Sequence, residues 1–180
     1  MHALNHYQRW LFAAGAVFCL ALLGTALYFQ HVMGLEPCPL CIFQRLFVIG
    51  LGTVMLMAAI HNPRHIGRRA YGGLILILSA CGAAVAGRHV WLQSLPADQV
   101  PACGPGLEYL LDSFPLMDAL KLVFEGSGEC AEVQWTFLSL SIPGWTLVIF
   151  VGLAVFGLLL LFSPKASSES GIKGFDPSVR

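Results

Sequence analysis

The chain has 180 residues, of which 57% are hydrophobic and only 11% are charged, and its formal net charge is zero. A mean hydropathy of +0.73 is too high for an ordinary soluble domain of this length. The sequence has no basic stripe with interleaved aromatic residues, so a nucleic-acid partner is not expected. The composition predicts an integral membrane protein.

The first predicted element is a membrane span over residues 10–29. This stretch contains no charged residue, and it is long enough to cross a hydrocarbon core of about 30 Å as a helix. Arg9 before it, with Gly24 and Ala26 near its end, also resembles a cleavable signal peptide. The apolar run continues to Phe29, which a signal peptide does not need, so a span is the better interpretation.

Three further apolar runs predict membrane-spanning helices at about 40–60, 70–95 and 142–162. The third run ends before Pro96, because proline cannot continue a helix. The predicted fold class is therefore all-α, a four-transmembrane-helix bundle in which the whole chain is a single membrane domain. The predicted connections are a loop at 30–39, a turn at 61–69, a long loop at 96–141 and a tail at 163–180.

Basic residues indicate which side of the membrane is cytoplasmic. Arg9, the arginine-rich turn at 61–69 and the basic residues of the tail fall on one side of a four-span chain. By the positive-inside rule, both termini are then cytoplasmic. The loops at 30–39 and 96–141 face outward, into a periplasm or an equivalent oxidising space.

The six cysteines divide between two environments. Cys19 and Cys81 lie inside apolar runs and are interpreted as small buried hydrophobes. The other four face the outer side, where disulfides can persist. They are Cys38, Cys41, Cys103 and Cys130.

The long outer loop contains a predicted amphipathic segment. Apolar residues recur at spacings of three and four between Leu107 and Phe124, with a break at Pro115. Such a segment predicts a short helix in the membrane interface, although packing against protein is a close alternative. The Pro- and Gly-rich flanks should leave Cys103 and Cys130 free to move.

The motif Cys38-Pro39-Leu40-Cys41 is the strongest local signal in the chain. Proline suits the first helical position, so a helix is predicted to begin between the two cysteines, with Cys41 in its first turn. The helix N-terminus and Arg45, one turn further on, should stabilise a thiolate at Cys41 more than at Cys38. The motif therefore favours redox chemistry.

Other uses of the four outer cysteines were weighed against redox chemistry. Zinc sites usually take two closely spaced pairs, whereas Cys103 and Cys130 are far apart in sequence, so no metal is expected. Ile42 stands where a haem-attachment histidine would be. Two structural disulfides remain possible, but they do not explain a thiol pair beside an arginine in the membrane interface.

Three polar residues are predicted to lie at the depth of Cys41. Arg45, His89 and Gln30 each fall near the outer end of a predicted span, where an ionisable or polar group is a functional candidate. Cationic and hydrogen-bonding groups around a thiolate at an apolar boundary suit a lipid-soluble, two-electron acceptor. A quinone fits that description.

In combination, the motifs resemble the bacterial disulfide bond formation protein B (DsbB) family over essentially the whole chain. The residues that carry the resemblance are Gln30-His31-Val32-Met33, Pro37-Cys38-Pro39-Leu40-Cys41 with Arg45, His89 with Leu92 and Gln93, Cys103, and Gly128-Glu129-Cys130-Ala131-Glu132 with Trp135. The resemblance implies a bacterial inner-membrane protein that reoxidises DsbA, a periplasmic thiol oxidase, and passes the electrons to ubiquinone or menaquinone.

The resemblance also implies a role for each outer cysteine. Cys103 and Cys130 would form the disulfide that reduced DsbA attacks, with Cys103 taking the mixed disulfide. Cys38 would exchange with Cys130, and Cys41 would be the thiolate that meets the quinone ring. Arg45 would assist at the quinone, with His89 and Gln30 nearby.

Two alternatives to this function are kept. One is a non-catalytic tetraspan membrane protein with two structural disulfides. The other is a protein like vitamin K epoxide reductase, which also couples Cys-x-x-Cys to a quinone on a four-helix bundle. The position of the motif at the second span, with the other cysteine pair after it, favours the DsbB family.

Overall fold

The computed structural model describes residues 2–63, 65–96, 98–100 and 128–162, together with positions 115, 117, 118, 121 and 126. Cys103, most of the predicted amphipathic segment and the tail at 163–180 lie outside the described residues. The described chain is almost entirely helical, as an apolar membrane protein requires, because helices satisfy their own backbone hydrogen bonds.

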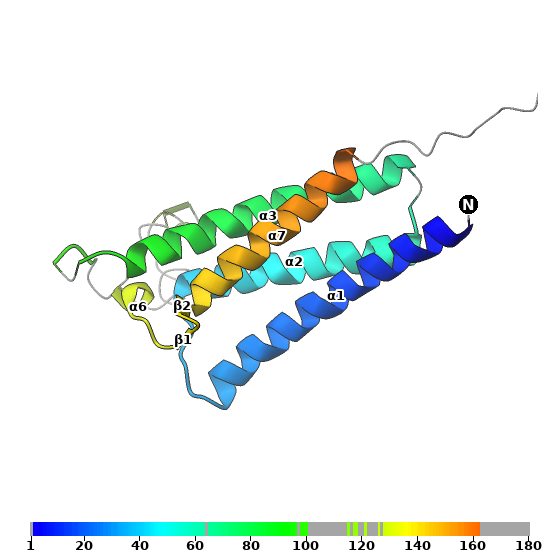
Figure 1. Cartoon of the computed structure of the whole chain (residues 1–180). Coiled ribbons are helices and arrows are strands. Elements are labelled where there is room, and N and C mark those ends of the chain that lie inside the picture. The colour runs from blue at the N-terminus through cyan, green and yellow to red at the C-terminus, as the bar shows by residue number, and fades with distance from the viewer. Residues whose placement is uncertain are drawn as a thin grey trace, which may run out of the picture.

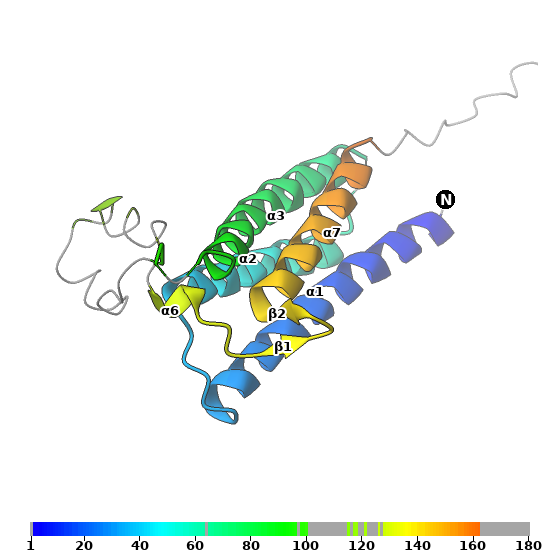
Figure 2. The same cartoon turned by 60° about the vertical axis from the view of Figure 1, so that its left-hand side comes forward.

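Four long helices form the body of the molecule (Figure 1). They are α1 (His2–His31), α2 (Pro39–His61), α3 (His65–Gln93) and α7 (Ile142–Phe162). A single turn, α6 (Gly128–Ala131), and an antiparallel hairpin of β1 (Thr136–Phe137) and β2 (Leu140–Ser141) precede α7. Figure 2 shows α6 and the hairpin at one end of the bundle, near the start of α2.

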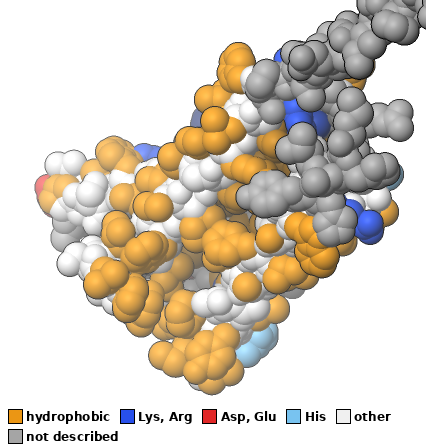
Figure 3. All heavy atoms as spheres, turned by 45° about the vertical axis from the view of Figure 1, so that its right-hand side comes forward, with side chains coloured by type: hydrophobic (Ala, Val, Ile, Leu, Met, Phe, Trp, Pro, Cys, Tyr) orange, Lys and Arg blue, Asp and Glu red, His pale blue; other side chains and the backbone are white. Residues whose placement is uncertain are grey.

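These four helices are the ones within the described chain that are long and apolar enough to cross a membrane. Large hydrophobic side chains such as Leu20, Ile60 and Leu159 point outward. Hydrophobic side chains are spread over the whole described surface in the view of Figure 3. Such a surface suits lipid, so the prediction of an all-α, four-helix membrane bundle is confirmed.

Glycine allows α3 and α7 to form the most extensive helix pair. A Cβ atom added at Gly157 would lie 2.8 Å from the Leu76 backbone nitrogen and 2.9 Å from the Gly72 carbonyl oxygen. Small residues permit this close approach of two membrane helices. The other main helix pairs are α1 with α2 and α2 with α3.

Buried side chains form two clusters. The first, called the central core here, joins all four long helices and consists of Phe12, Ala16, Cys19, Val48, Leu51, Met55, Ala58, Ala59, Ile75, Ala86 and Phe150. The second, called the cysteine cluster, lies where α6 meets α2 and α3, and consists of Cys38, Leu40, Val85, Leu92 and Cys130.

Two local features differ from the sequence prediction. The third predicted span ends at residue 95, whereas α3 ends at Gln93, where the Ser94 hydroxyl donates to the Trp91 carbonyl in place of a further helical turn. The hairpin was not predicted, because Leu138 and Ser139 occupy its turn at positive φ, without the Asn-Gly or Asp-Gly signal.

Candidate functional site

Helix α2 begins at Pro39, so the predicted helix start between the two cysteines is confirmed. Cys38 is the residue before the helix, with an extended backbone, and Cys41 lies in the first turn. The Cys38 and Cys41 sulfur atoms are 3.2 Å apart, and no disulfide joins them in this structure. Cys38 is buried, whereas Cys41 is partly exposed. The local sequence thus orients the two sulfurs differently.

His89 lies on α3 and faces both cysteines. Its Nε2 atom is 3.8 Å from Cys38 Sγ, and its Nδ1 atom is 4.0 Å from Cys41 Sγ. The side chain is only 2% exposed. A buried imidazole beside two thiols can donate a hydrogen bond to a thiolate or hold a proton close to it.

Gln44 and Thr146 extend this contact across the bundle. The Thr146 hydroxyl, on α7, donates to Gln44 Oε1 at 2.5 Å, and Gln44 Nε2 donates to His89 Nδ1 at 3.1 Å. Because Nδ1 then accepts, the imidazole proton is on Nε2, which faces Cys38. Three helices therefore orient one ring.

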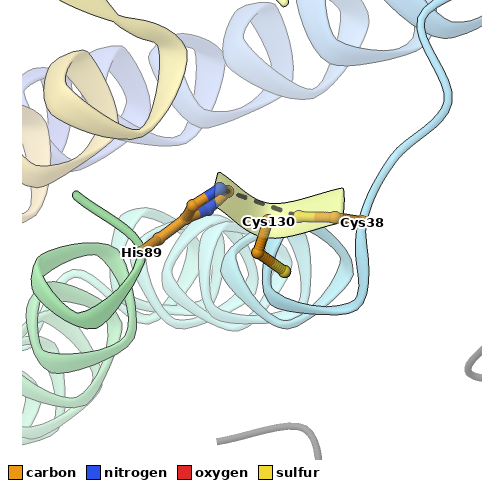
Figure 4. A group of neighbouring side chains, drawn as sticks. All are labelled: Cys38, His89 and Cys130. Atoms are coloured by element: carbon orange, nitrogen blue, oxygen red, sulfur yellow. Dashed lines mark hydrogen bonds between the residues drawn. The ribbon is translucent and has the colours of Figure 1, made fainter. Parts of the chain in front are cut away.

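Cys130, one member of the second predicted cysteine pair, lies close to Cys38. Figure 4 shows Cys130 on α6, next to Cys38 and His89. The Cys38 and Cys130 sulfurs and a ring nitrogen of His89 all lie within 4.8 Å of one another. Cys130 is 1% exposed. Its predicted partner, Cys103, lies outside the described residues.

Arg45 is held by the end of α1. One guanidinium nitrogen donates to Gln30 Oε1, and the other donates to the Ala26 carbonyl oxygen at 3.2 Å. Arg45 and Gln30 are thus brought together, as their predicted common depth requires. The two bonds fix the direction of the guanidinium plane.

A cavity of about 350 Å³ lies beside this arginine, between α1, α2, the hairpin and α7. Most of its wall is apolar, and the polar groups that reach it include Cys41, Gln44 and Arg45. Aromatic rings form part of the wall. The ring centroids of Trp135 and Phe29 are 5.2 Å apart, and the Trp135 ring stacks on that of Phe137. An apolar cavity with a few convergent polar groups is the usual form of a small-molecule site.

A smaller hollow of about 40 Å³ adjoins the cysteine pair and shares Cys41 with the larger cavity. Cys38, Cys41 and His89 line it. Three exposed carboxylates also line it, those of Glu36, Glu129 and Glu132. Cys41 therefore borders both the apolar cavity and the acidic hollow, whereas Cys38 borders only the hollow.

Sequence reasoning predicted Cys38, Cys41, Arg45, His89 and Gln30 as site residues. The structure brings His89 to the two cysteines and Gln30 to Arg45, and Cys41 and Arg45 line the same cavity. Sequence reasoning assigned no role to Gln44 and did not consider Thr146. A lone amide one turn after Cys41 in an apolar helix was the available signal for Gln44.

Comparison with known proteins gives consistent results. The family model described as disulfide bond formation protein DsbB matches residues 8–160. Proteins named disulfide bond formation protein B match most of the chain. That of Nitrosococcus oceani is 58% identical over 150 residues, covering 83% of this chain and 89% of the relative. That of Azoarcus sp. is 48% identical over 165 residues, covering 92% and 99% respectively.

Proposed function

Because the chain belongs to the DsbB family of disulfide bond formation proteins, we propose that it oxidises a DsbA-like periplasmic thiol oxidase and passes the electrons to ubiquinone or menaquinone. The chain is a multi-pass bacterial membrane protein of disulfide bond formation. The observation that carries the finer proposal is the position of Cys38. Its sulfur lies 3.2 Å from that of Cys41 and within 4.8 Å of that of Cys130.

The proposed reaction is a series of thiol-disulfide exchanges. A thiolate of the reduced partner attacks Cys103 of a Cys103–Cys130 disulfide, which forms a mixed disulfide and releases Cys130 as a thiolate. Cys130 then attacks Cys38 of a Cys38–Cys41 disulfide, and Cys41 leaves as a thiolate. The second partner thiol resolves the mixed disulfide, so the partner departs oxidised and Cys103 is released.

Cys103 then attacks Cys130 of the Cys38–Cys130 bond. This step restores the Cys103–Cys130 disulfide and leaves Cys38 and Cys41 as a dithiol. The Nε2–H group of His89, 3.8 Å from Cys38 Sγ, can stabilise the thiolate that leaves Cys38 in this last exchange. The net change is the transfer of two electrons and two protons from the partner to the Cys38 and Cys41 pair.

The larger cavity fits a quinone as the electron acceptor. Its apolar and aromatic walls suit a lipid-soluble ring, and Arg45 and Gln44 offer hydrogen-bond donors. A quinone bound there would accept two electrons and two protons and return Cys38 and Cys41 to the disulfide. Cys41 is the member of the pair that lines this cavity, so it is the thiol proposed to meet the ring.

Energetics explain why such an acceptor is required. The reduction potential of a structural disulfide lies below about −300 mV, whereas that of DsbA lies near about −120 mV. For a two-electron couple, this difference in potential corresponds to about 8 kcal/mol. A stable bridge could not oxidise DsbA unaided. We propose that the quinone provides the driving force for this oxidation.

We also propose an orientation in the membrane. The loops at 30–39 and 96–141 face the periplasm, and both termini lie in the cytoplasm.

The test uses purified protein in detergent with ubiquinone and reduced DsbA. Quinone absorbance should fall with turnover in wild type and in the control Cys81→Ser, whose thiol is exposed on α3 away from the cysteine pair. Cys41→Ser should abolish quinone reduction. Turnover of Cys41→Ser at the wild-type rate would overturn the proposal.

A further inference from the structure

We propose that the reduced form of this protein binds one thiophilic divalent cation, with Zn²⁺ as the probe, through Cys38, His89 and Cys130, and that the bound ion blocks disulfide exchange. The block of exchange rests on the function proposed above, whereas the binding does not. The argument begins with the three ligand atoms, which lie within 4.8 Å of one another.

The ligands come from three separate segments, as Figure 4 shows. Cys38 precedes α2, His89 lies on α3 and Cys130 lies on α6. Their side chains are 7%, 2% and 1% exposed, respectively. Sequence spacing gave no sign of this set, because it separates Cys38 from Cys130 widely and does not identify His89 as a ligand.

The distance from Cys38 to His89 matches that of a tetrahedral zinc site, and Cys130 Sγ lies within 4.8 Å of both residues' ligand atoms. With Zn–S near 2.3 Å and Zn–N near 2.0 Å, neighbouring ligand atoms are about 3.5 to 3.8 Å apart. His89 Nε2 is already 3.8 Å from Cys38 Sγ. Cys41 Sγ lies 3.2 Å from Cys38 Sγ but outside this group of three ligands. Thiolate and imidazole donors select Zn²⁺ over Mg²⁺ or Ca²⁺.

The acidic hollow provides a route for a cation. Its volume of about 40 Å³ exceeds the room that one small ion needs. Glu36, Glu129 and Glu132 line it, and among its lining residues, all within the described chain, none is lysine or arginine. Three carboxylates along the hollow raise the local concentration of cations.

The residues behind His89 can support metal binding. A metal on Nε2 requires the imidazole proton on Nδ1, and Gln44 can accept it by turning its amide so that Oε1 faces the ring. The Gln44 amide nitrogen then donates to Thr146, whose hydroxyl is 2.9 Å from the Pro143 carbonyl oxygen and donates there. Each polar atom keeps a partner.

Redox state determines whether the site exists. Thiols lose their protons to bind Zn²⁺, whereas a disulfide offers no thiolate. The cation would therefore bind once Cys38, Cys41 and Cys130 are reduced. While bound, it would hold the sulfurs that must attack or be attacked, so neither exchange with Cys130 nor reoxidation of the pair could proceed.

The test uses the full-length protein in detergent, fully reduced by a phosphine without oxygen, and titrated with Co²⁺ and then with Zn²⁺. One equivalent of Co²⁺ should give thiolate-to-cobalt charge-transfer absorption and the visible bands of tetrahedral cobalt, and Zn²⁺ should remove both. The same wild-type protein after oxidation should give neither. Equal cobalt spectra in the reduced and oxidised forms would overturn the proposal without any substitution.

Substitutions locate the site. His89→Ala and Cys130→Ser should each weaken Co²⁺ affinity by more than about 100-fold, since even outer partners of metal ligands contribute 10- to 100-fold. Cys19→Ala and Cys81→Ser, which alter cysteines away from the cluster, should bind as wild type does. Unchanged affinity in both ligand variants would also overturn the proposal. Because no partner or quinone is present, failure here leaves the proposed oxidase function standing.

Discussion

The central core and the cysteine cluster are both buried, yet they bury different chemistry. Leu51 and Met55 in the central core are fully buried among apolar neighbours. The cysteine cluster instead lies beside the buried imidazole of His89 and the buried amide of Gln44. Burial joins the helices in the first region. In the second region, burial holds the thiols and the imidazole of His89 at fixed distances. Hydrogen bonds from Thr146 to Gln44 and from Gln44 to His89 join three helices there.

The largest expected difference comes from removing one thiol in each region. Cys38→Ala should lower turnover with reduced DsbA by more than about 1,000-fold, because the Cys38–Cys41 disulfide that Cys130 is proposed to attack can no longer form. Cys19→Ala, a change to a cysteine that is 3% exposed in the central core, should keep turnover. It should instead lower the free energy of unfolding by about 1 kcal/mol.

Quinone absorbance and thermal unfolding in detergent measure the two effects. The opposite result, loss of turnover in Cys19→Ala with retention in Cys38→Ala, would show that the two regions have been assigned wrongly.

The second prediction concerns the close crossing of α3 and α7, next to the central core. Gly157→Ala should lower the free energy of unfolding by about 1 to 3 kcal/mol, because the added Cβ meets backbone atoms of α3 that cannot move aside alone. Gly152→Ala is the matched control on the same helix, since its Cβ would meet nothing within 4 Å. Equal thermal unfolding of the two variants would contradict the close crossing.

The third prediction concerns the buried amide of Gln44. Gln44→Leu leaves the His89 ring and the Thr146 hydroxyl without their partner, and should lower the free energy of unfolding by about 1 to 3 kcal/mol. Thr146→Val removes the hydroxyl that donates a hydrogen bond to Gln44. In a double-mutant cycle the two changes should couple by about 0.5 to 3 kcal/mol. Additive effects would mean that the two side chains act independently.

The sequence was sufficient for features that depend on neighbouring residues. Four long apolar runs predict four spans, and Pro39 between two cysteines predicts where α2 begins. These predictions succeed because hydrophobic length and proline geometry act locally. The predicted common depth of Arg45 and Gln30 also agrees with their hydrogen bond, because depth in a membrane follows from position along a span.

Features that depend on how helices meet could not be predicted. Hydrogen bonds from Thr146 to Gln44 and from Gln44 to His89 join α7, α2 and α3. The spacing of these residues in the sequence does not determine which sides of the helices pack together. The approach of Cys130 to Cys38 likewise depends on where α6 docks. The turn of the hairpin lacks a glycine or asparagine that would have indicated it.

The smallest expected effect is that of Arg45, which lines the larger cavity. The cavity beside Arg45 is lined by Val48 and Phe150 of the central core and by Cys41, which packs against the cysteine cluster. Lysine cannot reach Gln30 Oε1 and the Ala26 carbonyl with one planar group, so Arg45→Lys should misplace the charge. The Michaelis constant for quinone should rise about tenfold, equivalent to about 1.4 kcal/mol, while thermal unfolding stays near that of wild type. Arg69→Lys, at an exposed position on α3, should leave both unchanged. If Arg45→Lys lowers stability and not quinone affinity, the arginine belongs to the cohesion of the bundle rather than to the site.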